Sequence, residues 1–175
     1  IQSEAERGFN ADQVVVKVLR KKMMGNPRMF AACAGDLFKE GLILASLNHK
    51  NILGTRALAC GGITAYKSGR HDAFFLVLDR LEDTLADRIK DWQSQKKKLS
   101  IFSGSNKNKA SKKSALLDLK FDIILQLADA IGYIHSRGMI HRDIKPDNIG
   151  FDAAGALKVF DFDVARVLPE AQFPD

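Results

Sequence analysis

The chain has 175 residues, of which 46% are hydrophobic and 27% charged, a composition typical of globular domains. This composition excludes a collagen, a disulfide-rich miniprotein and a chain that is disordered throughout. The formal net charge of +6 is concentrated in one place, because residues 94–113 hold seven lysines and no acidic residue. Removing these seven from the 27 basic residues leaves 20 against 21 acidic ones, so the rest of the chain is near neutral.

The cysteine pattern and the hydropathy exclude further classes of protein. Cys33 and Cys60 have no Cys or His at a spacing that suits a metal, so we expect two reduced thiols. No apolar run approaches the roughly 20 residues that a membrane span needs. No charged and then apolar leader opens the chain. These features predict a cytosolic or nuclear protein without a membrane partner.

The first half of the chain carries signals for three strands and one helix. The predicted strands are residues 13–19, 56–60 and 73–78. The first of these is a β-branched run interrupted by one charge, Lys17. After a break at residues 25–27, Asp36 can cap a helix whose apolar residues recur at helical spacing until Asn48. Together these signals predict an antiparallel sheet that carries one helix.

The second half is predicted to be mainly helical. A short amphipathic helix at residues 83–92 precedes the lysine-rich residues 94–113, whose Ser, Asn, Gly and Lys composition predicts a flexible loop. A long helix is predicted over residues 116–135, and Gly138 follows it as a C-terminal breaker. The apolar face of that helix is predicted to contain Leu117, Phe121, Ile124, Ala128, Ile131 and His135. Short strands are predicted at residues 149–151 and 157–160.

Four motifs in a fixed order carry the information about function. They are H-R-D-I-K-P-D-N at residues 141–148, the Asp161-Phe162 pair, V-V-V-K at residues 14–17, and Glu40 nine residues before His49. In these motifs the chain resembles the eukaryotic-type protein kinases. A lysine two residues after the aspartate of H-R-D, here Lys145, is similar to the serine/threonine class. The resemblance covers residues 13–168 apart from the lysine-rich segment.

The resemblance implies an α+β, two-lobed protein kinase-like fold. A small antiparallel β-sheet lobe with one helix and the hinge would occupy about residues 13–81. A mainly helical lobe, with the lysine-rich insert 94–113, would occupy residues 82–175. Only Gly8 stands where a Gly-rich phosphate loop is expected, and the chain stops before an A-P-E motif. We therefore expect residues 1–175 to be a truncated, partial kinase domain that is weakly active or inactive by itself.

The resemblance also implies how the chain would handle the phosphates of ATP. Phosphoryl transfer depends mainly on positioning and on neutralising phosphate charge. Lys17 would hold the α- and β-phosphates, and Glu40 would pair with it to aim the ammonium group. Asp143 would accept the proton of the substrate hydroxyl, and Lys145 would steady the γ-phosphate. His141 is expected to be structural rather than catalytic.

Metal and adenine binding are implied in the same way. Asn148 and Asp161 would bind Mg²⁺, a hard cation that prefers oxygen ligands. The backbone carbonyl of Asp79 and the backbone of Leu81 would meet the edge of the adenine ring. Because backbone groups would do this, the side chains at both positions carry little information.

Three positions depart from the family pattern. Asp163 replaces the glycine of the D-F-G motif, and a glycine there permits a positive φ and a close approach of the backbone. We expect the extra carboxylate to change metal affinity or switching. Val15 replaces a small alanine beside the adenine, and Gly150 stands where a leucine usually supports the ring. We expect a nucleotide pocket that is reshaped but not closed.

The predicted function is transfer of the γ-phosphate of ATP, with Mg²⁺, to Ser and Thr hydroxyls of a protein substrate. The alternative is a pseudokinase or scaffold module that binds nucleotide or a partner without turnover, and Asp163 leaves it open. A further alternative is an adaptor that binds an acidic partner through residues 94–113, although a solvated loop is the simplest interpretation of that segment. Phe102 is its only aromatic residue, which argues against nucleic acid as a partner.

Overall fold

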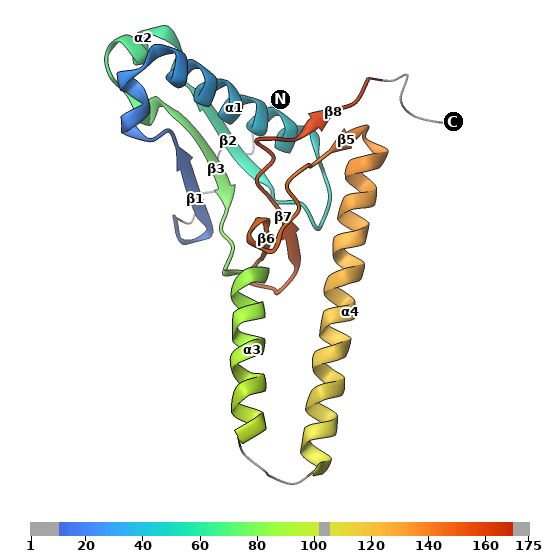
Figure 1. Cartoon of the computed structure of the whole chain (residues 1–175). Coiled ribbons are helices and arrows are strands. Elements are labelled where there is room, and N and C mark those ends of the chain that lie inside the picture. Colours follow the sequence, from blue (N-terminus) through green and yellow to red (C-terminus); the bar gives the residue numbers. More distant parts are fainter. Residues whose placement is uncertain (1–10, 102–105, 170–175) are drawn as a thin grey trace. The chain divides into compact units, whose positions relative to one another are not determined.

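The structure is a computed structural model that describes residues 11–101 and 106–169 (Figure 1). The described residues form two compact units. The first unit contains residues 11–48, 53–80 and 162–164, and the second contains residues 49–52, 81–101, 106–161 and 165–169. In these ranges no helix is both long enough and apolar enough to cross a membrane.

A three-stranded antiparallel sheet forms the centre of the first unit. Its strands are β1 (Val14–Val18), β2 (Thr55–Cys60) and β3 (Phe74–Asp79), and they lie in the order β1-β3-β2. Every second residue of β3 is buried, namely Phe74, Leu76 and Leu78. This alternation is typical of a strand that has one face on a core. The predicted sheet is confirmed, and each strand bound agrees with its prediction to within one residue.

The helix of this unit, α1 (Pro27–Ser46), begins before Asp36, so the predicted start of this helix is wrong. Asn26 is the N-cap, because its side-chain oxygen accepts hydrogen bonds of 3.0 and 3.1 Å from two backbone N–H groups of the first turn. Pro27 occupies the first helical position, where a missing N–H is tolerated. The break predicted at residues 25–27 is therefore the beginning of the helix.

α1 packs its apolar face against the sheet. The buried residues of the helix are Phe30, Leu37, Glu40, Gly41, Ile43 and Leu44. A Cβ atom at Gly41 would lie 2.7 Å from Cδ2 of Leu76 and 3.0 Å from the methyl groups of Leu58. The glycine thus allows the helix to approach β2 and β3 closely. This approach brings the inner face of α1, with Glu40, next to the sheet.

Four short helices complete the first unit. They are η2 (Ala11–Gln13), η3 (Lys21–Gly25), α2 (Gly62–Lys67) and η4 (His71–Ala73). α2 begins at Gly62, directly after Gly61, and glycine is a poor helix former. The ring centroid of Tyr66 in α2 lies 4.5 Å from that of Phe30. The ring centroid of Phe30 lies 4.9 Å from that of Phe74. These aromatic contacts across the unit stabilise a helix for which the local sequence has little preference.

The second unit contains two small antiparallel sheets. One has the strands β4 (Asp83–Thr84), β6 (Ile149–Phe151) and β7 (Leu157–Val159) in the order β4-β6-β7, and the other pairs β5 (Met139–Ile140) with β8 (Arg166–Val167). A short helix, η5 (Pro146–Asn148), leads into β6. The predicted strands that correspond to β6 and β7 are confirmed. β5 and β8 are two residues long, which is too short for an alternating pattern in the sequence.

Residues 49–52 belong to the second unit although they follow α1 directly in the chain. The Asn51 side chain is buried, and its Nδ2 donates to Oε1 of Gln126 at 2.8 Å and to the backbone oxygen of Leu157 at 3.0 Å. Ile52 forms a parallel bridge with Val159. These contacts attach the segment to β7 and to the long helix that carries Gln126.

The lysine-rich segment is helical where the structure describes it, so the predicted loop over residues 94–113 is wrong there. α3 (Leu85–Ile101) runs through the first three lysines, and α4 (Asn106–Ser136) contains the other four. Residues 102–105 of the predicted loop lie outside the described residues. Lys, Gln and Ala are good helix formers, and the segment contains no proline. Apolar periodicity therefore predicted only part of each of these two helices.

The face of α4 that packs in this unit differs from the predicted one. Its buried apolar residues are Ile123, Ala130 and Ile134. Leu117, Phe121 and Ile124 of the predicted face are 52, 56 and 59% exposed. The helix has apolar residues on more than one side, and periodicity alone cannot tell which side meets β5 and β7.

Candidate active site

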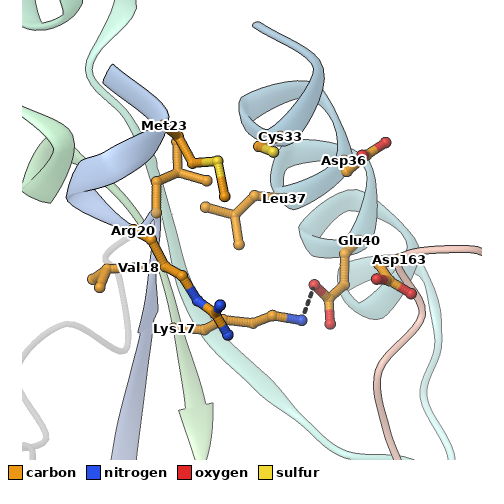
Figure 2. A pocket seen from close by; sticks show the side chains of 10 residues that line it. Lys17, Val18, Arg20, Met23, Cys33, Asp36, Leu37, Glu40 and Asp163 are labelled. Atoms are coloured by element: carbon orange, nitrogen blue, oxygen red, sulfur yellow. Dashed lines mark hydrogen bonds and ion pairs between the residues drawn. The ribbon is translucent and has the colours of Figure 1, made fainter. Parts of the chain in front are cut away.

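In the first unit, Lys17 is paired with a buried glutamate. The Lys17 Nζ donates a hydrogen bond of 2.7 Å to Oε2 of Glu40 (Figure 2). The Glu40 side chain is 2% exposed and that of Lys17 is 39% exposed. Burial of an ionised carboxylate is expensive unless a cation compensates it. The ion pair that the family resemblance implies is therefore present.

Two regular elements hold this ion pair. Lys17 lies in β1 opposite Leu76 of the central strand. Glu40 lies on the inner face of α1, one turn after the buried Leu37 and one turn before the buried Leu44. The apolar neighbours anchor the helix, so the glutamate is carried into the unit as one member of an otherwise apolar face.

A cavity of about 300 Å³ lies next to the ion pair, entirely within the first unit (Figure 2). Its lining residues are Lys17, Val18, Leu19, Arg20, Met23, Cys33, Asp36, Leu37, Glu40 and Asp163. The cations come from β1 and the residues after it, and the acidic residues come from α1 and from position 163. No sequence motif marks Arg20 or Met23 as part of this site, because tertiary packing brings them there.

In the second unit, Asp143 is bound by two neighbours from its own loop. The Nζ of Lys145 donates to Oδ2 of Asp143 at 2.7 Å. Nδ2 of Asn148 donates to the same Oδ2 at 2.7 Å and to the backbone oxygen of Asp143 at 2.9 Å. The hydrogen bond from Lys145 is the main reason that the pKa of Asp143 lies below its usual value. The bond to Asp143 likewise raises the pKa of Lys145, to which the charges of Asp147 and Asp161 add.

His141 orients this loop. It is 3% exposed, its Nδ1 accepts a hydrogen bond of 3.3 Å from the backbone N–H of Asp143, and its Nε2 lies 3.0 Å from the backbone oxygen of Phe160. Since Nδ1 accepts, Nε2 carries the proton and donates to Phe160. The imidazole therefore links the Asp143 loop to the strand end before Asp161, as the structural role expected for this histidine requires.

Backbone strain coincides with these motifs. Among residues 11–101 and 106–169, the non-glycine residues with positive φ are Arg142 at 69° and Asp161 at 66°. Such conformations cost of order 1 kcal/mol or more and persist where surrounding contacts impose them. The Phe160 N–H donates to the backbone oxygen of Asn148 at 3.1 Å, which fixes the chain just before Asp161. Asp163 has no positive φ.

The side-chain oxygen atoms of Asn148 and Asp161 are of the kind that Mg²⁺ accepts as ligands. Both hydrogen bonds from Asn148 to Asp143 use the amide nitrogen, so the Asn148 Oδ1 is the amide atom left for a cation. The described residues contain no group of three or more His, Cys, Asp or Glu side chains that could hold a metal. Mg²⁺ needs no such group, because it commonly takes one or two protein oxygens and completes its shell with phosphate and water.

The residues expected at the adenine edge lie where the chain passes from the first unit to the second. Asp79 ends β3, and the carboxylate of Asp79 accepts a hydrogen bond of 2.6 Å from Nε of Arg56. The Arg80 N–H donates to Gln13 and the Glu82 N–H donates to Phe151. The Leu81 backbone lies between these two anchored residues.

The space beside Gly150 is filled by Leu81. A Cβ atom at Gly150 would collide with Cδ1 of Leu81 and would lie 3.2 Å from the backbone oxygen of Asp83. The loss of bulk expected from Gly150 is therefore offset by a side chain from a different element. The sequence carries no signal that Leu81 fills the space beside Gly150, because these residues meet only in the folded unit.

The comparisons agree with the geometry. The family model described as protein kinase domain matches residues 4–174. CBL-interacting protein kinase 9 of Oryza sativa subsp. japonica is 49% identical over 47 residues, which are 27% of this chain and 10% of that protein. Serine/threonine-protein kinase ppk34 of Schizosaccharomyces pombe is 54% identical over 48 residues, 27% of this chain and 14% of that protein.

A third relative, serine/threonine-protein kinase PKH2 of Saccharomyces cerevisiae, is 54% identical over 43 residues, 25% of this chain and 4% of that protein. The matched segments thus span between 4 and 14% of the length of these three relatives. The family model, in contrast, covers nearly the whole chain. The chain therefore belongs to the eukaryotic-type protein kinase family.

Proposed function

We propose that this chain is part of a serine/threonine protein kinase that transfers the γ-phosphate of ATP to hydroxyl groups of a protein substrate. The observation that carries the proposal is the Asp143 carboxylate, which Lys145 and Asn148 hold in one orientation. The bond from Lys145 lowers the pKa of Asp143 further below the neutral range, so this carboxylate is ionised at neutral pH. An ionised, fixed carboxylate can orient a substrate hydroxyl and accept its proton.

The other charged residues have roles that follow from their surroundings. Lys17, aimed by the buried Glu40, would bind the α- and β-phosphates, and Lys145 would neutralise charge on the γ-phosphate. Asn148 and Asp161 are the residues that would hold Mg²⁺. When bound, this ion would supply further neutralisation of the phosphate oxygens. The backbone of Asp79 and Leu81 would bind the adenine edge.

The proposed serine/threonine specificity rests on Lys145 and on similarity to relatives such as serine/threonine-protein kinase ppk34. Three peptides that differ only in one acceptor, Ser, Thr or Tyr, test it. Because the chain by itself is expected to be weakly active or inactive, the assay uses the full-length kinase of which it is proposed to be part. Phosphate transfer to the Ser and Thr peptides is then expected. Transfer to the Tyr peptide alone would contradict the assignment.

Replacement of Asp143 by Asn tests the proposed base. The variant keeps the size of the side chain and its contact to Asn148, so nucleotide binding with Mg²⁺ is expected to persist. Phosphate transfer is expected to fall by about 10²-fold or more. Asp118→Asn, which makes the same charge change on the exposed surface of α4, is the matched control and is expected to keep transfer. Equal transfer by the Asp143 variant and the control would contradict the proposal.

A pseudokinase that binds nucleotide without turnover is the second candidate. The observation that favours it is Asp163, which adds a carboxylate to the cavity beside Lys17. Binding of ATP and Mg²⁺ by the full-length protein, without product formation on any of the three peptides, would support this candidate. Detection of phosphopeptide that disappears with Asp143→Asn would exclude it.

A further inference from the structure

The cavity beside the ion pair carries an excess of negative charge. Its charged lining consists of two cations, Lys17 and Arg20, and three carboxylates, Asp36, Glu40 and Asp163. The formal sum is one negative charge. Without the Asp163 carboxylate, which stands where the family has a glycine, the lining would be neutral.

Asp163 acts through its charge and not through its backbone. The non-glycine residues with positive φ in the described ranges are Arg142 and Asp161, so Asp163 has a conformation that ordinary residues adopt. The conformational freedom that a glycine would supply at this position is therefore unused in this structure. What the aspartate adds is a half-buried carboxylate that lines the cavity together with Lys17 and Glu40 (Figure 2).

A fixed negative charge affects two forms of a nucleoside triphosphate differently. The metal-free triphosphate carries four negative charges at neutral pH, and its magnesium complex carries two. Charges within a Debye length of about 8–10 Å interact with little screening, and less still when they are partly buried. A carboxylate beside the phosphate-binding lysine therefore opposes the metal-free form about twice as strongly as the complex.

We propose that Asp163 makes this site selective for the magnesium complex of a nucleoside triphosphate by excluding the metal-free form. This inference rests on the proposed function, because it assumes that Lys17 binds the phosphates. It assigns Asp163 as a residue that determines which form of the nucleotide is accepted. A glycine at this position would leave metal dependence to Asn148 and Asp161 alone.

The test is the dissociation constant of ATP for the 175-residue chain, measured by calorimetry with Mg²⁺ and with EDTA at equal ionic strength. The quantity of interest is the dissociation constant measured in EDTA divided by the dissociation constant measured with Mg²⁺. Asp163→Asn and Asp163→Gly are each expected to lower this ratio by at least about fivefold, through tighter binding of metal-free ATP. Asp163→Glu, which keeps the charge, is expected to retain a ratio close to that of the unchanged chain.

Asp72→Asn is the matched control. It removes one negative charge from an exposed side chain of the same unit that pairs with Arg70 and does not line the cavity. The ratio is expected to stay unchanged in this variant.

Three results would overturn the inference. The first is an unchanged ratio in Asp163→Asn. The second is a lower ratio in Asp163→Gly alone, which would indicate a backbone effect. The third is a change of the ratio in Asp72→Asn as large as that in the Asp163 variants. Lack of ATP binding with Mg²⁺ in the unchanged chain would instead overturn the proposed function, and this inference with it. Circular dichroism of each variant identifies any that do not fold.

Discussion

The Nδ2 of Asn148 donates hydrogen bonds to both the Oδ2 and the backbone oxygen of Asp143, at 2.7 and 2.9 Å. One amide group thus fixes the side chain and the main chain of the same residue. The amide oxygen of Asn148 is turned away from Asp143 as a consequence. The proposed base and the proposed metal ligand therefore have orientations that depend on each other.

The first prediction concerns the ionisation of Asp143. Lys145→Met removes the hydrogen bond that is the main cause of its lowered pKa, so the pKa of Asp143 is expected to rise toward its usual value of 3.8. Carbon-detected NMR titration of the carboxyl group measures this change. Lys158→Met, which removes a lysine that bonds to Lys50 and Asp152 instead, is the control and is expected to leave Asp143 unchanged.

The same pair predicts a sign for the pH dependence of stability. The folded-state pKa of Asp143 is below its unfolded value, so its contribution is present above pH 3.8 and is lost as the pH falls through the lower, folded value. The pKa of Lys145 is raised, so its contribution is present below pH 10.5 and is lost as the pH rises through the higher value. The stability difference between the unchanged chain and Lys145→Met is expected to be constant between these limits. A difference that changes sign near neutral pH would contradict this assignment.

A second prediction concerns the ion pair of Lys17 and Glu40. Lys17→Met leaves the buried Glu40 without this partner, and we expect a loss of stability of about 1–2 kcal/mol, since the lysine itself is partly exposed. Adding Glu40→Gln to Lys17→Met removes the uncompensated charge and is expected to restore part of this loss. Urea unfolding of the two single variants and the double variant measures the coupling. Strict additivity would show that the two residues do not interact energetically.

A third prediction uses the contact between Gly150 and Leu81. Gly150→Ala places a methyl group against Leu81 and the backbone of Asp83, so a destabilisation of about 1–3 kcal/mol is expected. Gly132→Ala is the matched control, because nothing lies within 4 Å of a Cβ there and the residue is in α4. The control is expected to stabilise the chain by about 0.5–1 kcal/mol. Thermal unfolding distinguishes the two signs, and Leu81→Ala is expected to relieve the Gly150 variant.

A fourth prediction concerns an acidic partner at residues 94–113. Replacing Lys96, Lys97 and Lys98 by Gln is expected to weaken binding of poly-glutamate by several-fold, and the difference should shrink at high salt. Replacing Lys21, Lys22 and Lys67 by Gln makes the same charge change in the first unit and is the control. Fluorescence anisotropy of labelled poly-glutamate measures both. Equal weakening by the two variants would show a general charge effect and no local site.

The motifs were sufficient to predict the ion pair between Lys17 and Glu40. Lys17 and Glu40 form the expected ion pair, because a strand lysine and a glutamate on the apolar face of a helix both have a defined direction. Asp143, Lys145 and Asn148 meet within eight residues of sequence, so their contacts depend on local geometry. The predicted sheet was correct because β-branched and apolar runs bounded by turn residues favour strands.

The errors have a common cause in competing local signals. The Asn26-Pro27 pair is a helix-start signal that Asp36 outweighed in the prediction, although the Asn26 side chain makes the capping bonds. The lysine-rich segment was predicted as a loop from its low hydrophobicity, but helix formation depends also on intrinsic propensity.

At the start of α3, Thr84 and Asp87 exchange hydrogen bonds in a capping box. The hydrogen bond from the Thr84 side chain is the main cause of the lowered pKa of Asp87.

The sequence by itself determined the family and the order of the motifs, since these depend on residue identity and spacing. Only the tertiary structure decided that Leu81 occupies the space beside Gly150 and that Asp163 shares a cavity with Lys17 and Arg20. Contacts between residues far apart in the chain depend on how whole elements pack, and no local pattern encodes that packing. For the same reason, the net charge of the cavity lining can be read only from the folded unit. The inferred selectivity for the magnesium complex over the metal-free nucleotide depends on that charge.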